Sequence, residues 1–337
     1  MNIYDISEKS GVSIATVSRV LNGSAHVSEK TRQKVLAVME EEGYQPNAFA
    51  RGLGLNTMKV IGILYSDSSD TFLSSAIYHL ERNFRSHGYD SLLCCTGYIL
   101  EDRQKYTQWI LSKRVHALVL VGSHFVEENE DDNAYIRAAA SQVPVAILGA
   151  RLTGENIYCS LCDDYLSSIH LAESLFQRGS EQIAFLYHVV SDSVRKKLAG
   201  LREAYLRKGM VFREKNALLC PSHDIDACVD FLRAMNRQLS FDTIMCMDDQ
   251  LAVGALKYAQ AEQIAVPSDL QIAGYNNSVL ARCSTPELTT VDNHLEELCE
   301  AVVQMIIARL TGLPAENLYT VQGTIVYRDT TLPKEEL

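Results

Sequence analysis

The feature that most limits the possible folds is a regular alternation of short apolar segments with amphipathic ones. Predicted strands begin near Val60, Asp90, Ala117 and Val145, 27 to 30 residues apart, and a second series begins near Gln182, Ala217, Thr243 and Gln271. This spacing is typical of β-α-β units, whose parallel strands form a sheet that helices cover on both faces. Residues 59–337 are therefore predicted to be an α/β body of two doubly wound parallel-sheet lobes. Their ligand cleft should lie at the carboxyl ends of the strands.

The composition is that of an ordinary soluble globular protein, with 47% hydrophobic and 22% charged residues. No apolar run approaches the ~18 residues that a membrane span needs. The first residues lack the basic region and apolar core of a signal peptide. We therefore expect a cytoplasmic protein with no membrane partner.

The net charge of −11 argues against nucleic-acid binding by the chain as a whole, but this charge is unevenly distributed. Residues 1–58 hold six basic and six acidic residues, so residues 59–337 carry 25 positive and 36 negative charges, which is the whole −11. Between residues 9 and 34 there are five basic residues and one acidic residue, a local +4 patch. A small head with a basic patch therefore precedes a large acidic body.

The first 44 residues are predicted to form three short helices, with Asn2, Ser13 and Ser28 as N-caps. Only three residues join the first two helices, and one of them is Gly11. A short bend with glycine between two helices is typical of a helix-turn-helix. The alternative is a small helical bundle in which these polar residues are only caps. The combination of the bend with a second helix that exposes Ile14 and Arg19 favours DNA binding.

In a helix-turn-helix the second helix enters the major groove of DNA. Arg19 can donate two hydrogen bonds to a guanine, and Ile14 and Ala15 can contact thymine methyl groups, with Ser18 on the same face. Hydroxyl and amide groups for phosphate contacts come from Ser13, Thr16, Asn22 and Ser28.

Three segments of the head resemble the signature of the lactose-repressor family (LacI/GalR type): residues 11–23 (GVSIATVSRVLNG), 27–32 (VSEKTR) and 43–48 (GYQPNA). Segments of the body match the same family, including residues 60–63 (VIGI), 248–255 (DDQLAVGA), 273–277 (AGYNN) and 286–291 (PELTTV). The resemblance therefore covers essentially the whole chain. It implies a DNA-binding transcription regulator, with repressor the expected role. Such a protein binds a palindromic operator as a homodimer and is controlled by a small-molecule effector, a sugar or related metabolite.

The resemblance also implies the organisation of the chain. Residues 1–44 are the DNA-binding head, 45–58 a hinge helix or linker, and 59–337 the effector-binding and dimerisation core. Within the core, the N-lobe is expected at about 59–161 and 292–319, and the C-lobe at about 162–291 and 320–332.

In this family the hinge helices enter the minor groove at the centre of the operator. Asn47, Arg51 and Leu53 match its DNA-contacting positions, and Leu53 matches the apolar wedge that enters a base step. Gly52 and Gly54 each cost ~1 kcal/mol of helix propensity, so we expect a helix that forms only on DNA. Without the signature of the head, a flexible tether would be the preferred interpretation.

The expected effector contacts lie after strands or at helix starts of the body: Ser69, Phe72, Arg195, Lys197, Asp248 and Asn276. Three of these positions depart from the family. Lys197 stands where the family usually has Arg, Asn276 where it has Asp, and Asp248 where it has Asn. Since Lys cannot make the two-pronged contact of Arg, a sugar bound in the usual way is a weaker expectation here. Ordinary helix caps would also place polar groups at these positions.

The nine cysteines are scattered through apolar segments, which indicates reduced core residues. Cys159 and Cys162 form the only CxxC, and no second pair completes a zinc site, so packing is favoured over a redox pair and no metal site is expected. The chain lacks a Gly-x-Ser-x-Gly elbow, a P-loop and a His-Glu-x-x-His motif. We therefore expect neither catalytic residues nor a cofactor. The rival functions are a secreted solute-binding protein, which would need a signal and no helix-turn-helix, and an α/β enzyme.

Overall fold

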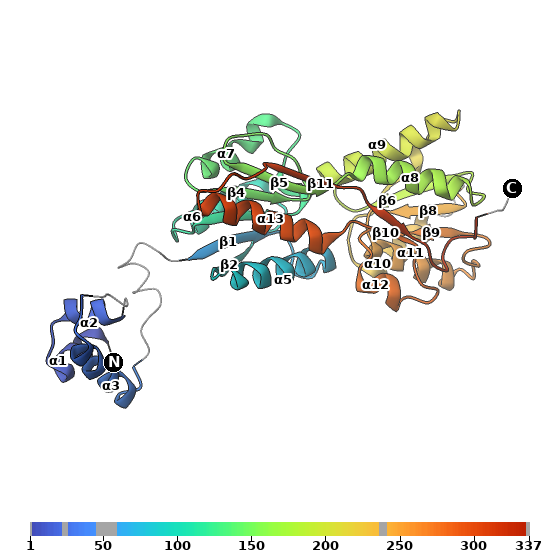
Figure 1. Ribbon diagram of the computed structural model, residues 1–337. Helices are drawn as coiled ribbons and strands as arrows, with labels where there is room; N and C mark the ends of the chain where they lie inside the picture. The colour runs from blue at the N-terminus through green and yellow to red at the C-terminus, as the bar shows by residue number, and fades with distance from the viewer. Residues whose placement is uncertain (1, 22–25, 45–58, 236–240, 335–337) are drawn as a thin grey trace. The chain divides into compact units, whose positions relative to one another are not determined.

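The computed structural model describes residues 2–21, 26–44, 59–235 and 241–334 (Figure 1). By its internal contacts the chain divides into two compact units, Met1–Val60 and Ile61–Leu337. Among the described residues, no helix combines the length and apolar character required to cross a bilayer.

The first unit contains three helices, α1 (Ile3–Ser10), α2 (Ile14–Leu21) and α3 (Glu29–Glu41). The predicted caps are confirmed. The side chain of Asn2 accepts hydrogen bonds from the N–H groups of Tyr4 and Asp5, and Ser28 accepts one from Thr31. Gly11 ends α1 with φ +64°, a left-handed conformation that glycine adopts without strain. The core of this unit comprises the buried side chains Ile6, Val17, Val20, Val35 and Met39.

The N-lobe of the second unit is built on a six-stranded sheet in the order β11-β5-β4-β3-β1-β2. Its strands are β1 (Val60–Tyr65), β2 (Asp90–Cys95), β3 (Ala117–Val121), β4 (Val145–Leu148), β5 (Ile157–Cys162) and β11 (Leu318–Val321). Helices α5 (Thr71–Ser86) and α13 (Leu295–Leu310) pack together over one face. Helices α6 (Leu100–Leu111) and α7 (Ala134–Ala140) contact each other beside the 3₁₀ turns Ser123–Phe125 and Glu130–Asn133.

The C-lobe has a four-stranded parallel sheet in the order β7-β6-β8-β9. These strands are β6 (Ile183–Tyr187), β7 (Ala217–Leu219), β8 (Thr243–Cys246) and β9 (Gln271–Ala273). Helices α8 (Asp164–Phe176) and α9 (Asp192–Arg207) cover one face, and α10 (Ile225–Met235) and α11 (Asp249–Ala261) cover the other. The short α12 (Val279–Cys283) contacts α11, and a 3₁₀ turn Glu214–Asn216 precedes β7.

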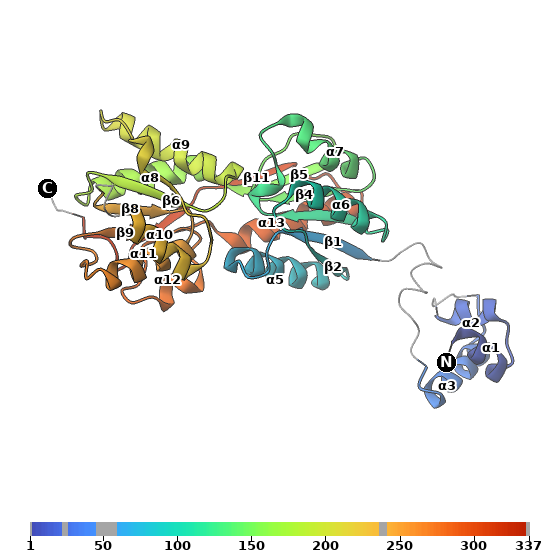
Figure 2. The ribbon, with the colours of Figure 1, turned by 180° about the vertical axis from the view of Figure 1, so that it is seen from behind.

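The chain passes between the two lobes after β5, after β10 (Thr290–Asp292) and again between β11 and β12 (Thr324–Val326). Strands β10 and β12 pair antiparallel beside the C-lobe sheet, where Thr289 forms a bridge to Ala273. Figure 2 shows these crossing segments from behind, between the two groups of strands. Three segments of the chain therefore connect the two lobes.

The predicted α/β architecture with two parallel sheets is confirmed, and each of the eight predicted strands is present. Strand β5 was not predicted because its residues, IYCSLC, mix small and polar side chains into a short apolar run, although all six are buried. The nine cysteines are all free thiols, seven of them buried, as the apolar surroundings predicted.

Candidate functional site

Helix α2 presents one face to solvent and buries the other. Val17 and Val20 are buried in the head core, while Ile14, Ala15 and Arg19 are exposed. Residues 14, 15, 18 and 19 lie on the same face because residues four apart are neighbours on a helix. The structure therefore brings together the four residues predicted to read bases, with Ser18 half-buried among them.

The hydroxyl groups predicted to contact phosphates lie at helix starts. Ser13 Oγ is 2.9 Å from Thr16 Oγ1 and accepts a hydrogen bond from the backbone N–H of Thr16. Ser28 Oγ has the same two partners on Thr31. Helix starts carry partial positive charge, so phosphate groups bind there favourably. Asn22, Asn47, Arg51 and Leu53 lie outside the described residues.

Part of the positive charge of the head is balanced internally. Lys9 pairs with Glu42, which joins α1 to the end of α3, and Arg32 lies 3.7 Å from Glu29. Two of the five basic residues counted between positions 9 and 34 therefore have acidic partners within the head. Arg19 lies on the exposed face of α2, where a base contact was predicted.

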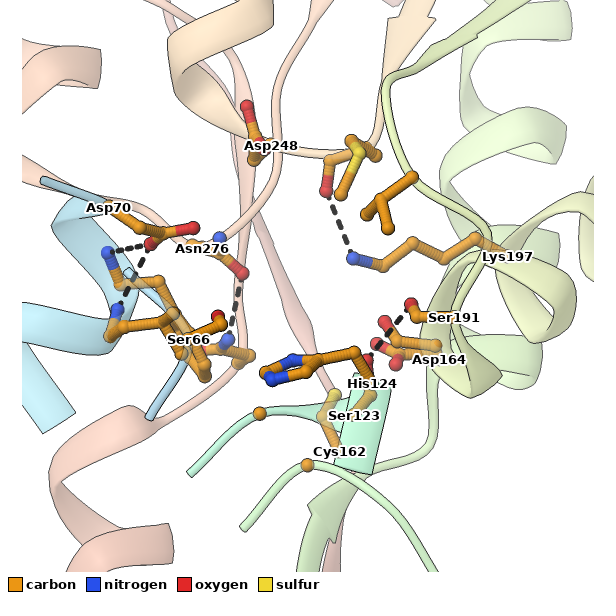
Figure 3. Close-up of a pocket in the computed structure, with 18 of the residues that line it drawn as sticks. Ser66, Asp70, Ser123, His124, Cys162, Asp164, Ser191, Lys197, Asp248 and Asn276 are labelled. Atoms are coloured by element: carbon orange, nitrogen blue, oxygen red, sulfur yellow. Dashed lines mark hydrogen bonds between the residues drawn. The ribbon is translucent and has the colours of Figure 1, made fainter. Parts of the chain in front are cut away.

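The second unit contains a pocket of about 100 Å³ between the two sheets of the core (Figure 3). The N-lobe contributes residues after β1 and β3 and at the start of α5, and the C-lobe contributes residues after β6, β8 and β9 and at the starts of α8 and α9. Its polar lining includes Ser66, Asp70, Tyr98, Ser123, His124, Asp164, His188, Ser191, Lys197, Asp248, Asn276 and Asn293. The pocket thus lies at the carboxyl ends of the parallel strands, as such folds require.

Four of the six predicted effector contacts line this pocket: Phe72, Lys197, Asp248 and Asn276. Ser69 does not line it; its hydroxyl donates to Asp67 at 2.7 Å in an exposed turn. Arg195 does not line it either, and it lies 3.9 Å from Asp192, one turn earlier on α9. Arg195 and Lys197 are two positions apart on a helix and so point in different directions, which sequence order alone does not convey.

Lys197 is buried and already has partners. Its Nζ donates to the backbone oxygen of Met247 at 3.0 Å (Figure 3). The same atom lies 3.6 Å from the centre of the Tyr275 ring. The Tyr275 hydroxyl in turn donates to Asp164 Oδ1 at 2.7 Å. Lys197 therefore packs within the wall of the pocket and also contributes a positive charge to it.

The pocket is rich in carboxylates. Burial raises the pKa of Asp70, and the negative charge of Asp248 adds to that rise, although N–H groups at the start of α5 and the nearby His223 offset part of it. Burial alone would raise the pKa of Asp248 too, but the hydrogen bond and charge of His223 outweigh burial and lower it. Asp248 is therefore ionised at neutral pH, whereas the surroundings of Asp70 disfavour its ionised form.

His124 enters the pocket as a neutral ring. Burial, with the positive charge of Arg103, lowers its pKa to about 3. Arg103 itself is buried, donates to the backbone oxygen of His124 and pairs with Glu127. Asn133 and the hydroxyl of Tyr135 bond to the same turn, at the backbone of Glu127 and Phe125. The turn that carries His124 is thus fixed from three sides.

The sequence analysis missed several pocket residues: Tyr98, Ser123, His124, Asp164, His188, Ser191 and Asn293. Most of them follow a strand or begin a helix, so the rule that selected Asp248 and Asn276 would also have selected Ser123, His188 and Asp164. Ser123 Oγ donates to Ser191 Oγ at 3.0 Å, a direct hydrogen bond from one lobe to the other.

The comparisons with known proteins agree with this arrangement. Residues 2–47 match bacterial regulatory proteins of the lacI family, and residues 172–331 match a periplasmic binding protein-like domain. An HTH-type transcriptional regulator from Lachnoclostridium phytofermentans is 48% identical over 332 residues, covering 98% of this chain and 99% of that protein. The HTH-type transcriptional repressor PurR of Vibrio cholerae is 28% identical, with 97% of each chain covered. These relatives are named as regulators rather than as enzymes.

Among solved structures, the lac repressor dimer bound to operator and the anti-inducer ONPF aligns with a TM-score of 0.83 and 25% identity, over 99% of each chain. The matched families follow the same order along the chain as the helix-turn-helix unit and the two-lobed core described above. The protein therefore belongs to the LacI family of bacterial transcriptional regulators, as the resemblance in its sequence implied.

Proposed function

We propose that this protein represses transcription by binding a palindromic operator as a homodimer in the cytoplasm, and that a small neutral polyhydroxylated molecule in the pocket of the core controls this binding. The observation that carries the proposal is that one chain combines an exposed recognition face on α2 with a two-lobed pocket lined by hydrogen-bonding groups.

Base recognition is assigned to the exposed face of α2. Arg19 is the one long donor on that face and suits the two acceptors of guanine, whereas Ile14 and Ala15 suit thymine methyl groups. Ser13, Thr16 and Ser28 lie at helix starts and form hydrogen bonds with DNA phosphates. These bonds fix the register of α2 in the major groove. Minor-groove insertion by Leu53, with Asn47 and Arg51 beside it, stays a prediction.

Replacing Arg19 by Ala is expected to weaken binding to the cognate operator by ~1–3 kcal/mol, about 5- to 150-fold, and to relax base choice at one position of each half-site. Because Arg19 is exposed, the head should fold normally. Binding to operators randomised at each position measures this. Lys30→Ala, at an exposed residue in the first turn of α3, is the matched control and should weaken binding to all sequences alike. Equal weakening on all sequences by Arg19→Ala would refute direct readout.

Dimerisation through the core is supported by exposed apolar side chains on neighbouring elements of the N-lobe. Tyr78 on α5, Leu93 on β2, Ile99 before α6 and Trp109 on α6 are all exposed. Strand β2 is an edge strand of its sheet, and both α5 and α6 contact it. Exposed apolar groups on adjacent elements are typical of a protein interface. A dimer would place two heads on the two halves of a palindrome.

The proposed effector class follows from the charges of the pocket. Its lining holds three carboxylates, Asp70, Asp164 and Asp248, and one ammonium group, Lys197, which already bonds to Met247. An anionic ligand such as a sugar phosphate would meet net negative charge. The hydroxyl groups of a neutral ligand, by contrast, can donate hydrogen bonds to these carboxylates and accept them from the side-chain amides of Asn276 or Asn293. Phe72, half-buried at the pocket, can cover an apolar face of the ligand.

Control of DNA binding would come from rotation of the lobes about their crossing segments. The pocket is lined by residues of both lobes, so a ligand bound there contacts both and can favour one separation of the lobes over another. A change in this separation would alter contacts such as the Ser123–Ser191 hydrogen bond. A ligand shifts such an equilibrium only by its different affinity for the two arrangements.

A thermal-unfolding screen tests the effector class. A neutral sugar at 100 times its Kd should stabilise the core by about 2.7 kcal/mol, whereas the corresponding sugar phosphate should not. Asn276→Gly should abolish the shift, because it removes the amide while glycine suits the φ of +93° at this position. Ser69→Ala, outside the pocket lining, is the control and should leave the shift unchanged. Stabilisation by the phosphate alone would contradict the charge argument.

A further inference from the structure

Two histidines line the pocket of the core, one from each lobe. His124 lies in the 3₁₀ turn after β3 of the N-lobe, and His188 follows β6 of the C-lobe. Figure 3 shows the imidazole ring of His124 among the lining side chains. The ring of Tyr98, between β2 and α6, makes a T-shaped contact with each imidazole, at centroid distances of 5.2 Å to His124 and 6.4 Å to His188. The two imidazoles thus approach the pocket from different lobes beside one tyrosine.

Each imidazole has a nitrogen atom that is not hydrogen-bonded. Within the part of the chain that the structure describes, His124 Nε2 and His188 Nδ1 are shielded from solvent and have no hydrogen-bond partner. Burial, with the nearby His223, lowers the pKa of His188 to about 4, and burial likewise keeps His124 neutral. A neutral imidazole offers one N–H donor and one acceptor. A buried polar atom without a partner costs free energy, which a bound molecule can recover.

The N-lobe ring is held by packing and by its backbone. A Cβ atom at Gly122 would lie 2.6 Å from His124 Cε1, so the absence of a side chain at Gly122 leaves room for the ring. The ring also packs against Phe125, with centroids 4.5 Å apart. Arg103 donates to the backbone oxygen of His124. None of these contacts uses Nε2, which therefore stays available to a molecule in the pocket.

The C-lobe ring is held in a similar way. His188 stacks on His223, with centroids 4.1 Å apart and planes inclined by 10°. His223 Nε2 is in turn 2.8 Å from Asp248 Oδ2, a hydrogen bond that orients the lower ring of the stack. The backbone N–H of His188 lies 3.4 Å from the sulfur of Met247. The stack and the backbone position His188 without using its Nδ1. A binding group held in this way needs little reorganisation when its ligand arrives.

We propose that His124 and His188 are specificity-determining residues, and that each forms a hydrogen bond with a different hydroxyl group of the effector. The proposal rests on the proposed function, in which the effector is neutral and polyhydroxylated. A hydroxyl group can donate to or accept from an imidazole nitrogen, so either tautomer of each ring suffices. A ligand that carries both hydroxyl groups joins the two lobes. A ligand that lacks one of them leaves a buried nitrogen unpaired and binds more weakly.

Calorimetric titration of the full-length protein with the common neutral aldopentoses and aldohexoses and their β-1,4-linked disaccharides tests the proposal. Each single-deoxy derivative of a sugar that binds is titrated as well. His124→Phe and His188→Phe keep a ring but remove the nitrogen, and each should weaken binding of the parent sugar by about tenfold or more. Each variant should bind one deoxy derivative as tightly as the unaltered protein binds it, because the hydrogen bond is then absent from both. The two variants should identify two different hydroxyl groups.

Stability without sugar gives a second readout. Because the replaced nitrogens have no partner within the described protein, neither variant should melt at a lower temperature than the unaltered protein. His124→Leu and His188→Leu, which are less bulky than phenylalanine, should show the same dependence on one hydroxyl group. His87→Phe, at an exposed histidine that ends α5, is the matched control and should leave every affinity unchanged.

The outcomes separate this inference from the proposed function. If a sugar binds but a variant at either position loses the same factor for the parent and for every deoxy derivative, the effector class stands and the assignment of these histidines is overturned. If no member of the panel binds the unaltered protein, the proposed effector class is wrong and the roles of His124 and His188 fall with it.

Discussion

Gly200→Ala should lower the free energy of unfolding of the core by roughly 2 kcal/mol. Gly200 is buried on α9 where this helix contacts α8, and a Cβ atom there would lie 2.3 Å from the backbone oxygen of Tyr165 and 2.8 Å from Ser168 Cβ. A backbone oxygen in a helix cannot swing away, so the two helices would have to separate. Overpacking of this kind costs about 1–3 kcal/mol or more and outweighs the ~1 kcal/mol that alanine gains in helix propensity.

The same change should disturb the pocket, because Lys197 lies one turn before Gly200 on α9 and Asp164 begins α8. Denaturant unfolding measures the stability, and effector titration measures the pocket. Glu203→Ala, on the same helix, is the control; its ion pair with Arg207 is solvent-accessible and worth at most ~1 kcal/mol. If Gly200→Ala were as stable as Glu203→Ala, the contact between α8 and α9 would be looser than the structure has it.

Much of the fold could be predicted because its strongest signals are local. The caps Asn2 and Ser28 and the bend at Gly11 lie within three or four residues of the groups that they satisfy. The strands of parallel sheets are apolar runs, and most of them stand out from the helices on either side. Strand β5 did not, because its six residues mix small and polar side chains into a short apolar run.

The pocket was harder to predict because it is assembled from distant segments. Sequence order showed that Asn276 follows a strand and that Lys197 stands near the start of a helix, but it could not show that Arg195 lies outside the pocket lining or that His124 enters it. His223 gave no signal at all, since it lies in a loop and meets its partners Asp248 and His188 only in the folded protein. The strand pattern located the cleft. The departures from the family at Asp248 and Asn276 can be interpreted only once the neighbouring side chains are known.

The second large effect concerns Arg103, the buried residue that holds the turn carrying His124. Arg103→Met should lower the free energy of unfolding by about 2–4 kcal/mol. The buried backbone oxygen of His124 loses its donor, and Glu127 loses its partner. The cost should fall below that of a fully buried ion pair because the Glu127 side chain is one-third exposed and can be solvated. Denaturant unfolding of the two proteins measures the difference.

A second readout separates this role from simple loss of packing. The positive charge of Arg103 adds to burial in lowering the pKa of His124, so this pKa should rise in Arg103→Met, as an NMR titration of the ring can show. Glu127→Gln keeps an acceptor for Arg103 and should cost ~1 kcal/mol or less without raising the pKa of His124. If the two variants lost equal stability, the bond to the His124 carbonyl would contribute little. We also expect Arg103→Met, but not Glu127→Gln, to weaken effector binding. Arg103 does not line the pocket, so this loss would come from displacement of Ser123 and His124, which do.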